Sequence, residues 1–231
     1  MEEGFHSSNG LLHFFCFWGN RFVQTTSEET ADQIKPANMS STNATIDISS
    51  LALGDVVTTG KGAKQIPLST ISGDPVIWRP KDALTVLFEP SAYNQPDATR
   101  VNLCLSVTPA VVSCLQDLDE WCLSTLAAQS SKLLGSQLSV EEVRHRFQST
   151  IRVHEASGSQ SLRLKMNLSG RAAVRIWSPL GVQVSAPQSW SQCSAQCRIR
   201  LKGFWLMAKE IGVIAECTDV QLDQAAAECP F

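Results

Sequence analysis

The residues best suited to binding chemistry are basic and lie close together in the second half of the chain. Residues 152–209 contain nine Lys and Arg but a single acid, Glu155, so this stretch has a net charge of +8 in a chain whose net charge is −3. Such segregation of charge indicates a surface for an anionic partner. The nine basic residues are Arg152, Arg163, Lys165, Arg171, Arg175, Arg198, Arg200, Lys202 and Lys209.

Aromatic residues accompany these cations. Trp177, Trp190 and Trp205 lie in the same stretch, and Phe204 directly precedes the last of them. Because cations neutralise phosphates and aromatic faces stack on bases, this combination is typical of proteins that bind single-stranded nucleic acid. A β-sheet with one solvated basic face and buried Trp residues accounts for the same composition. Both interpretations stay open at this point.

The basic residues must be positioned by strands, because apolar and polar residues alternate around them. In the strand predicted at 161–168, Arg163 and Lys165 share the face opposite the leucines. The next predicted strand places Arg175 and Trp177 on the same side as each other.

Residues 197–222 are predicted to form a hairpin that turns at 208–210. Alternation in its first strand puts Arg198, Arg200 and Lys202 on one face. If this strand, the strand at 161–168 and the strand that contains Arg175 lie side by side in one sheet, their cations would form one basic surface.

The two aromatic residues near the end of this first strand fall on opposite faces if the alternation continues unbroken. Phe204 is then in register with the cations, and Trp205 is predicted to face the core.

The rest of the chain predicts short strands around a helical insertion. Short β-rich runs that end at Gly, Pro or Asp indicate strands at 64–69, 76–79, 84–88 and 101–107. From Pro109, apolar residues recur at helical spacing, at Val111, Leu115, Leu118, Cys122 and Leu126.

This helix is predicted to reach about Leu134, with Gly135 as its stop. Ser139 and Glu142 have the spacing of a capping box, which predicts the start of a second, shorter helix. Strands, one long and one short helix, and then strands again, without βαβ alternation, predict a mainly β fold of the α+β class. We expect an antiparallel OB-like barrel with the helices inserted between strands.

The predicted hairpin also resembles a known family. It reads Arg198-Ile-Arg-Leu-Lys-Gly-Phe-Trp-Leu-Met-Ala-Lys-Glu-Ile-Gly212 and later ends in Val220-Gln-Leu222. This is similar to the closing hairpin of single-stranded DNA-binding proteins from phages and large DNA viruses, in which a basic strand runs into an aromatic pair and a short polar turn with a Gly. Shorter pieces that look similar lie at 101–107, 115–120 and 162–165, so the resemblance covers roughly residues 64–222.

The resemblance implies a non-enzymatic, sequence-tolerant protein that binds single-stranded nucleic acid in DNA replication, recombination or repair. The ligand that it implies is DNA rather than RNA, although the residues alone do not distinguish the two. It implies that the basic residues of the three strands contact phosphates, and that Trp177 and Phe204 stack on bases. The nucleic-acid-binding residues expected in this way are Arg163, Lys165, Arg175, Trp177, Arg198, Arg200, Lys202 and Phe204.

Three regions are predicted along the chain: a flexible N-terminal extension at 1–50, an OB-like nucleic-acid-binding domain at 51–222, and a short acidic tail at 223–231 that ends in Phe. The resemblance implies that the tail docks replication proteins and competes with DNA. A frayed terminus is the simpler alternative for the tail.

No membrane or secretion segment is predicted. The apolar run at 11–18 is too short to span a bilayer, and Glu2 and Glu3 precede it where a signal peptide has a basic flank. Scattered cysteines fit a reducing, intracellular location in the nucleus or cytoplasm.

Other functions have weaker support. Only Cys193 and Cys197 are close together, with no second pair at zinc spacing, so no metal or other cofactor is predicted. The chain has no phosphate loop, nucleophile elbow or dinucleotide-binding glycine motif, so catalysis is not expected. The alternative that stays open is a β-domain whose basic face binds an acidic protein or an anionic surface, and a homodimer is compatible with either function.

Overall fold

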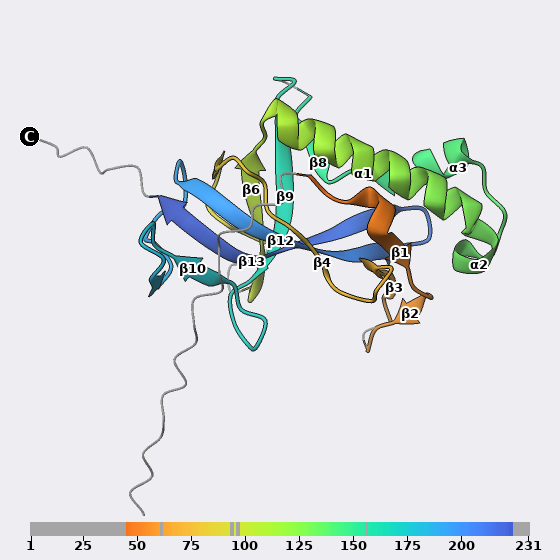
Figure 1. Cartoon of the computed structure of the whole chain (residues 1–231), viewed down its shortest axis with the longest axis horizontal. Helices are drawn as coiled ribbons and strands as arrows, with labels where there is room; N and C mark the ends of the chain where they lie inside the picture. The colour runs from red at the N-terminus through yellow and green to blue at the C-terminus, as the bar shows by residue number, and fades with distance from the viewer. Residues whose placement is uncertain (1–44, 61, 93–94, 96–97, 156, 224–231) are drawn as a thin grey trace, which may run out of the picture. The chain divides into compact units, whose positions relative to one another are not determined.

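The computed structural model describes residues 45–60, 62–92, 95, 98–155 and 157–223 (Figure 1). The strands before the helices are β1 (Leu51–Leu53), β2 (Val57–Thr58), β3 (Lys64–Thr70), β4 (Val76–Trp78), β5 (Leu84–Thr85) and β6 (Arg100–Ser106). The strands after them are β7 (Phe147–Gln148), β8 (Ile151–Val153), β9 (Gln160–Asn167), β10 (Arg175–Trp177), β11 (Gln183–Val184), β12 (Ser194–Leu206) and β13 (Ile211–Asp223).

The two predicted terminal segments fall mostly outside the described residues. Of the extension predicted at 1–50, residues 45–50 are described, and Ile46 is buried against the core. A 3-10 turn, η1 (Ile48–Ser50), leads directly into β1. The folded region therefore begins before residue 51. Of the predicted tail, only Asp223 is described, as the last residue of β13.

The hairpin of β12 and β13 is the centre of the sheet. The two strands pair antiparallel along their whole length, and Met207 N donates to the carbonyl of Glu210 at 2.8 Å in the turn between them. Along its other edge, β12 pairs with β5, β4 and β3 in succession. The other edge of β13 pairs with β7, β9 and β10. Six other strands therefore pair directly with this one hairpin.

These pairings curl the sheet into a partly closed, OB-like barrel. β6 pairs with β9 along its length, and Val86 just beyond β5 forms a bridge with Leu105 of β6. The path from β12 through β13, β9 and β6 thus returns to β12 through β5. At this seam Val86 N donates to the carbonyl of Cys193, and Leu87 N to that of Cys104, both at 2.9 Å. The predicted mainly β, OB-like α+β fold is confirmed, but the sheet is not antiparallel throughout, because β13 pairs parallel with β7, β9 and β10.

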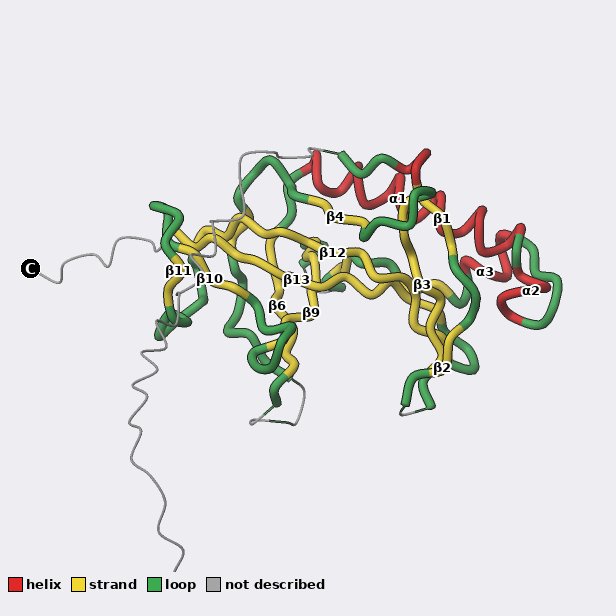
Figure 2. Tube along the Cα trace, turned by 60° about the horizontal axis from the view of Figure 1, so that its bottom comes forward, coloured by secondary structure: helices red, strands yellow, loops and turns green. Residues whose placement is uncertain are grey.

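Three helices among the described residues lie between β6 and β7. α1 (Pro109–Ala128) starts at Thr108, whose hydroxyl accepts the amide of Val111, as expected for an N-cap. A break at Gln129 divides the predicted long helix, so that α2 (Ser130–Leu134) is a separate turn that ends at Gly135 with φ 78°. α3 (Val140–Arg144) begins with the predicted capping box. Figures 1 and 2 show these helices together on one side of the sheet, at the opposite end from β10 and β11.

The core lies between the inner face of the barrel and α1. All five apolar residues predicted for the inner face of the long helix are buried there, together with the inward residues of β6, β9 and β12. No helix among the described residues is long and apolar enough to cross a membrane.

A β-bulge at Lys202–Gly203 interrupts the alternation of β12. Leu201 pairs with Ala215 and Gly203 pairs with Ile214, so Lys202 is an extra residue on its strand. Gly203 has φ 134°, and a Cβ at this position would lie 1.9 Å from the carbonyl oxygen of Ile66 in β3. Only glycine can adopt this backbone conformation and also leave room for the carbonyl of Ile66. Beyond the bulge, each residue of β12 faces the side opposite to the one that unbroken alternation predicts.

Replacing Gly203 with Ala should destabilise the fold by more than about 2 kcal/mol, because the added Cβ collides with β3 and the backbone conformation is strained for an L-residue. The free energy of unfolding in urea measures the effect. Gly60→Ala is a matched control, because a Cβ at position 60 would meet no atom within 4 Å. Equal stability of the two variants would contradict the prediction.

Candidate nucleic-acid interface

The six basic residues predicted to contact phosphates lie on one face of the sheet. Lys165 of β9 is the register partner of Glu216 of β13, and Glu216 is the partner of Arg200 of β12. Register partners in adjacent strands point to the same side. Arg163 and Lys202 are each two positions away from one of these cations on its strand.

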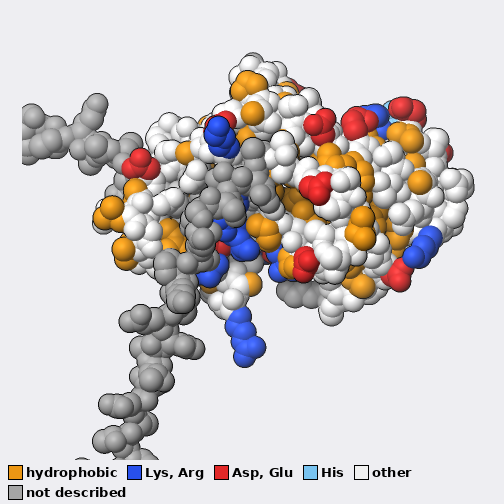
Figure 3. Space-filling model, in the orientation of Figure 1, with side chains coloured by type: hydrophobic (Ala, Val, Ile, Leu, Met, Phe, Trp, Pro, Cys, Tyr) orange, Lys and Arg blue, Asp and Glu red, His pale blue; other side chains and the backbone are white. Residues whose placement is uncertain are grey.

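The remaining two cations, Arg175 and Arg198, lie on the same face because both are opposite Asp219 of β13. Asp219 is the register partner of both Arg175 in β10 and Arg198 in β12. We call the surface formed by these six residues the basic face, and its members are Arg163, Lys165, Arg175, Arg198, Arg200 and Lys202. Figure 3 shows Lys and Arg side chains gathered near the middle of the view.

A second bulge explains why two acids of β13 share this face. Arg198 pairs with Asp219 and Ile199 pairs with Cys217, so Thr218 is an extra residue on its strand. Without the extra residue, Glu216 and Asp219 would point to opposite sides, because they are three positions apart. The bulge thus places both carboxylates beneath the cations.

Glu216 is buried within the basic face and holds two cations. Its Oε1 accepts a hydrogen bond from Nη2 of Arg100 at 2.6 Å, and its Oε2 lies 3.4 Å from Nζ of Lys202. The carboxylate side chain is 9% exposed, whereas Arg100 is 47% and Lys202 40% exposed. The cations are therefore anchored from below while their outer sides stay open to solvent.

Asp219 has the same role for two guanidinium groups. Its carboxylate accepts hydrogen bonds from Nη2 of Arg175 and from Nε1 of Trp177, both at 3.1 Å. It also forms ion pairs with Nε of Arg175 at 2.7 Å and with Nη1 of Arg198 at 3.5 Å. Burial raises the pKa of Asp219, but the hydrogen bonds from Arg175 and Trp177 outweigh burial and hold this pKa below its ordinary value. The ionised carboxylate fixes the direction of these side chains.

Three members of the basic face, Arg163, Lys165 and Arg200, have no carboxylate within 4 Å in the part of the chain that the structure describes. Nζ of Lys165 donates to Oδ1 of Asn102 at 2.8 Å. Partial burial and the positive charges of Arg100 and Arg163 lower the pKa of Lys165. A bound anion would relieve this repulsion.

The two aromatic residues predicted to stack on bases do not present open rings. Phe204 is 0% exposed in the core, because the bulge at Gly203 turns it inward. Trp177 lies on the same side as Arg175, as predicted, but it is 6% exposed and its indole N–H is bound to Asp219. Placing Phe204 among the cations was therefore wrong, and Trp177 supports the basic face from within.

Trp205 takes the position on the basic face that alternation assigned to Phe204. Its indole packs on Gly212 of β13, where a Cβ would lie 2.4 Å from Cζ2 of the ring. A groove of about 340 Å³ lies beside it, and its lining includes Thr150, Arg152, Arg163, Lys165, Trp205 and Met207. We call this cavity the Trp205 groove. The prediction that Trp205 faces the core was wrong, for the same reason that Phe204 is buried.

Sequence reasoning also missed Arg100 and Arg152 as members of the site. Arg100 lies outside the basic stretch, and Arg152 is in a strand too short to show alternation, where its Nη1 donates to Oε1 of Gln148 at 2.6 Å. A signal for the bulge was present, because an isolated Gly inside a strand pattern, as at Gly203, indicates a bulge or a close backbone approach.

Beside the groove, Ser149 contacts Asp119, a half-buried acid of α1. The hydroxyl of Ser149, a residue that lines the Trp205 groove, donates to Oδ2 of Asp119, and Oδ1 has no hydrogen-bond partner among the described residues. Burial raises the pKa of Asp119 to about 6; the bond from Ser149 opposes this shift and the negative charge of Glu120 adds to it.

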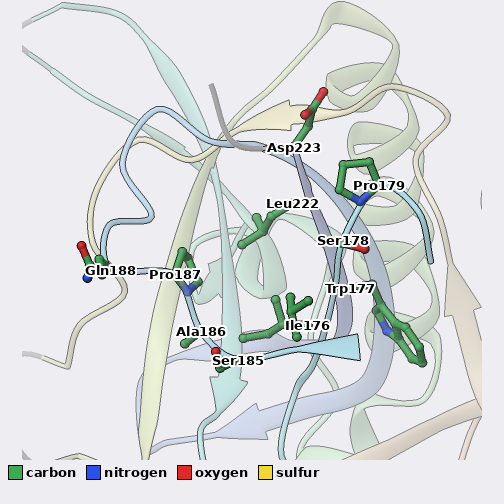
Figure 4. Close-up of a pocket in the computed structure, with 11 residues that line it drawn as sticks. Ile176, Trp177, Ser178, Pro179, Ser185, Ala186, Pro187, Gln188, Leu222 and Asp223 are labelled. Carbon is green, nitrogen blue, oxygen red and sulfur yellow. The ribbon is translucent and has the colours of Figure 1, made fainter. Parts of the chain in front are cut away.

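A separate cavity of about 550 Å³ lies at the end of β13 and is lined by Ile176, Pro187 and Leu222 among others. In Figure 4, Ile176 and Leu222 point toward each other, and Trp177 is turned away. None of the described residues that line it is Lys or Arg, and Asp223 is at its edge. This cavity is therefore chemically unlike the Trp205 groove and does not suit an anion.

No protein-family model and no curated protein matches the sequence. Among solved structures, the chain is similar to the single-stranded DNA-binding protein from bacteriophage Enc34 in complex with ssDNA, with 11% identity, a TM-score of 0.43, and 73% of this chain and 94% of that chain covered. It is also similar to gp2.5, a single-stranded DNA-binding protein encoded by bacteriophage T7, with 16% identity, a TM-score of 0.43, and 64% and 86% covered. At TM-scores below 0.5, these likenesses do not bear on what this chain binds.

The half-buried Asp119 should make stability fall as the pH rises. Its pKa of about 6 in the folded state exceeds the ordinary value of 3.8, so the folded state holds its proton more tightly and loses stability between these values. Relative to the wild type, Asp119→Asn should gain up to about 3 kcal/mol between about pH 4 and about pH 8. Urea unfolding across this range measures the difference.

Asp117→Asn, at an exposed position of the same helix, serves as the matched control and should show little relative change. A wild type and an Asp119→Asn variant with parallel pH profiles would refute the prediction.

Proposed function

We propose that this chain is a non-enzymatic, sequence-tolerant single-stranded DNA-binding protein that acts in DNA replication, recombination or repair. The observation that carries the proposal is the basic face, in which six cations from three strands lie on one side of the sheet. A single strand laid across these strands would meet one cation after another, as phosphate neutralisation requires.

The arrangement of the two buried carboxylates supports binding of an anion rather than only internal neutralisation. Glu216 and Asp219 contribute two negative charges against six cations and Arg100. The face therefore keeps an excess of positive charge. Because the acids lie beneath the cations, they fix these side chains and leave their outer sides for phosphates.

An aromatic side chain on the same face favours single-stranded nucleic acid over other anions. Trp205 is half-buried beside the cations, and Met207, two positions on, is 69% exposed. Apolar surface next to cations suits unpaired bases, which a duplex keeps stacked inside. An acidic protein or an anionic membrane surface would need the cations alone.

Binding should depend steeply on salt and on the exposed cations of the basic face. The triple variant Arg163→Ala, Arg200→Ala, Lys202→Ala should bind an oligo-dT of about 15 nucleotides more weakly and lower the salt slope by about 2, since each lost phosphate contact on a single strand removes about 0.7. Fluorescence titration between about 50 mM and about 200 mM NaCl measures both quantities.

Lys132→Ala is the matched control, because Lys132 is exposed and pairs with Asp55 away from the basic face. Duplex DNA, oligo-U and poly-glutamate are compared in the same assay. Equal binding of duplex and oligo-dT, or preference for poly-glutamate, would reject the proposal, and preference for oligo-U would replace DNA by RNA.

Removing a buried carboxylate should have the opposite effect on affinity. Glu216→Gln keeps the length of the side chain but removes one negative charge from the basic face. Binding of oligo-dT at low salt should tighten by about fivefold, which corresponds to the roughly 1 kcal/mol between unit charges 4 Å apart in water. Glu141→Gln, at an exposed residue of α3, should leave the affinity unchanged. Weaker binding by Glu216→Gln would show that the carboxylate mainly positions Arg100 and Lys202.

A further inference from the structure

We propose that the Trp205 groove is a nucleotide site, in which one unpaired base of a bound strand stacks on Trp205 while its phosphate meets Arg163 and Lys165. This inference rests on the proposed function and assigns to this groove the contact with a base. It differs from the expectation that Trp177 and Phe204 make that contact.

The apolar side of the groove is formed by the end of β12. The bulge at Gly203 turns Trp205 toward the groove. The indole packs directly on Gly212 of the neighbouring strand, which has no side chain in the way. Met207 extends the apolar surface and is mostly exposed. An aromatic ring and a flexible thioether at a solvent-accessible position can cover the faces of any base, so the site would tolerate different sequences.

The cationic side of the groove comes from β8 and β9. Arg152, Arg163 and Lys165 line it, and none of the three has a carboxylate within 4 Å among the residues that the structure describes. Arg152 is held by Gln148, and Lys165 by Asn102. Three cations beside an aromatic ring, two of them held in place by neutral partners, match a nucleotide, which has a phosphate next to a flat base.

A buried hydroxyl gives an independent indication of a ligand. Thr150 lines the groove and is 6% exposed, yet its Oγ1 has no hydrogen-bond partner among the described residues. A buried polar atom without a partner is costly, and native proteins seldom retain one without a reason. The edge of a base or a sugar-phosphate oxygen would supply the missing partner for Thr150.

The groove is also continuous with the basic face. Arg163 and Lys165 belong to both, so a strand that crosses β12 and β13 would reach the groove without leaving the cations. The cavity of about 340 Å³ is at the lower end of the range for small-ligand sites, which fits one nucleotide rather than several.

The test compares two ligands of equal charge. One is an oligo-dT of about 15 nucleotides, and the other is an abasic deoxyribose-phosphate chain of the same length. The wild type should bind oligo-dT more tightly, and Trp205→Ala should lose roughly tenfold in affinity for oligo-dT but little for the abasic chain. Phe88→Ala, which removes an exposed aromatic ring outside the groove, is the matched control and should keep the preference. Thermal unfolding of each variant confirms that it is folded.

Each outcome decides one of the two proposals. A wild type that binds neither ligand would reject the proposed function itself. A wild type that binds both ligands equally, or a Trp205→Ala variant that keeps the preference for oligo-dT, would overturn the nucleotide site and leave the proposed function in place.

A second variant tests the site independently, in case Trp205→Ala does not fold. Thr150→Val keeps the shape of the side chain and removes the unpaired hydroxyl. It should weaken binding of oligo-dT by roughly fivefold while the thermal stability of the free protein stays equal or rises, since no internal hydrogen bond is lost. Lower stability with unchanged affinity would show that the hydroxyl serves the fold, and would count against the site.

Discussion

The close approach of two strands at Gly203 determines which side chains this protein presents to solvent. β12 passes so near to the carbonyl of Ile66 that no side chain fits, and the bulge at this point shifts the strand by one residue. Phe204 thereby fills the core, and Trp205 lies beside the cations. The core and the Trp205 groove are thus two results of one backbone constraint.

Charge on the basic face is organised in two layers. Buried carboxylates hold Arg100, Lys202, Arg175 and Arg198 from below, whereas the cations at the groove are held only by neutral partners or by none. The first group is fixed before any ligand arrives, which lowers the entropy lost on binding. In the second group, the positive charges still repel one another, so an anion bound there would lower the electrostatic energy most. Orientation and attraction are therefore supplied by different residues.

Alternation and helix signals predicted the longer strands, the helix face and the capping box, because these depend on neighbours along the chain, but they did not predict the short strands β1, β2, β7 and β11. The common side of the cations on β9, β10 and β12 also followed from period two. The aromatic assignment failed because one extra residue reverses the period, and an extra residue depends on what the partner strand can accommodate. Arg100 could not be found either, since its place beside Glu216 depends on contacts between residues 116 positions apart.

Gly212 shows how a site can depend on a residue that has no side chain. The indole of Trp205 occupies the space where a Cβ would stand, so any other amino acid at this position would displace the ring. An alanine scan detects what is lost when atoms are removed, and here it would add atoms instead. In a genetic screen, substitutions at position 212 should therefore behave like loss of Trp205, although this residue has no side chain of its own.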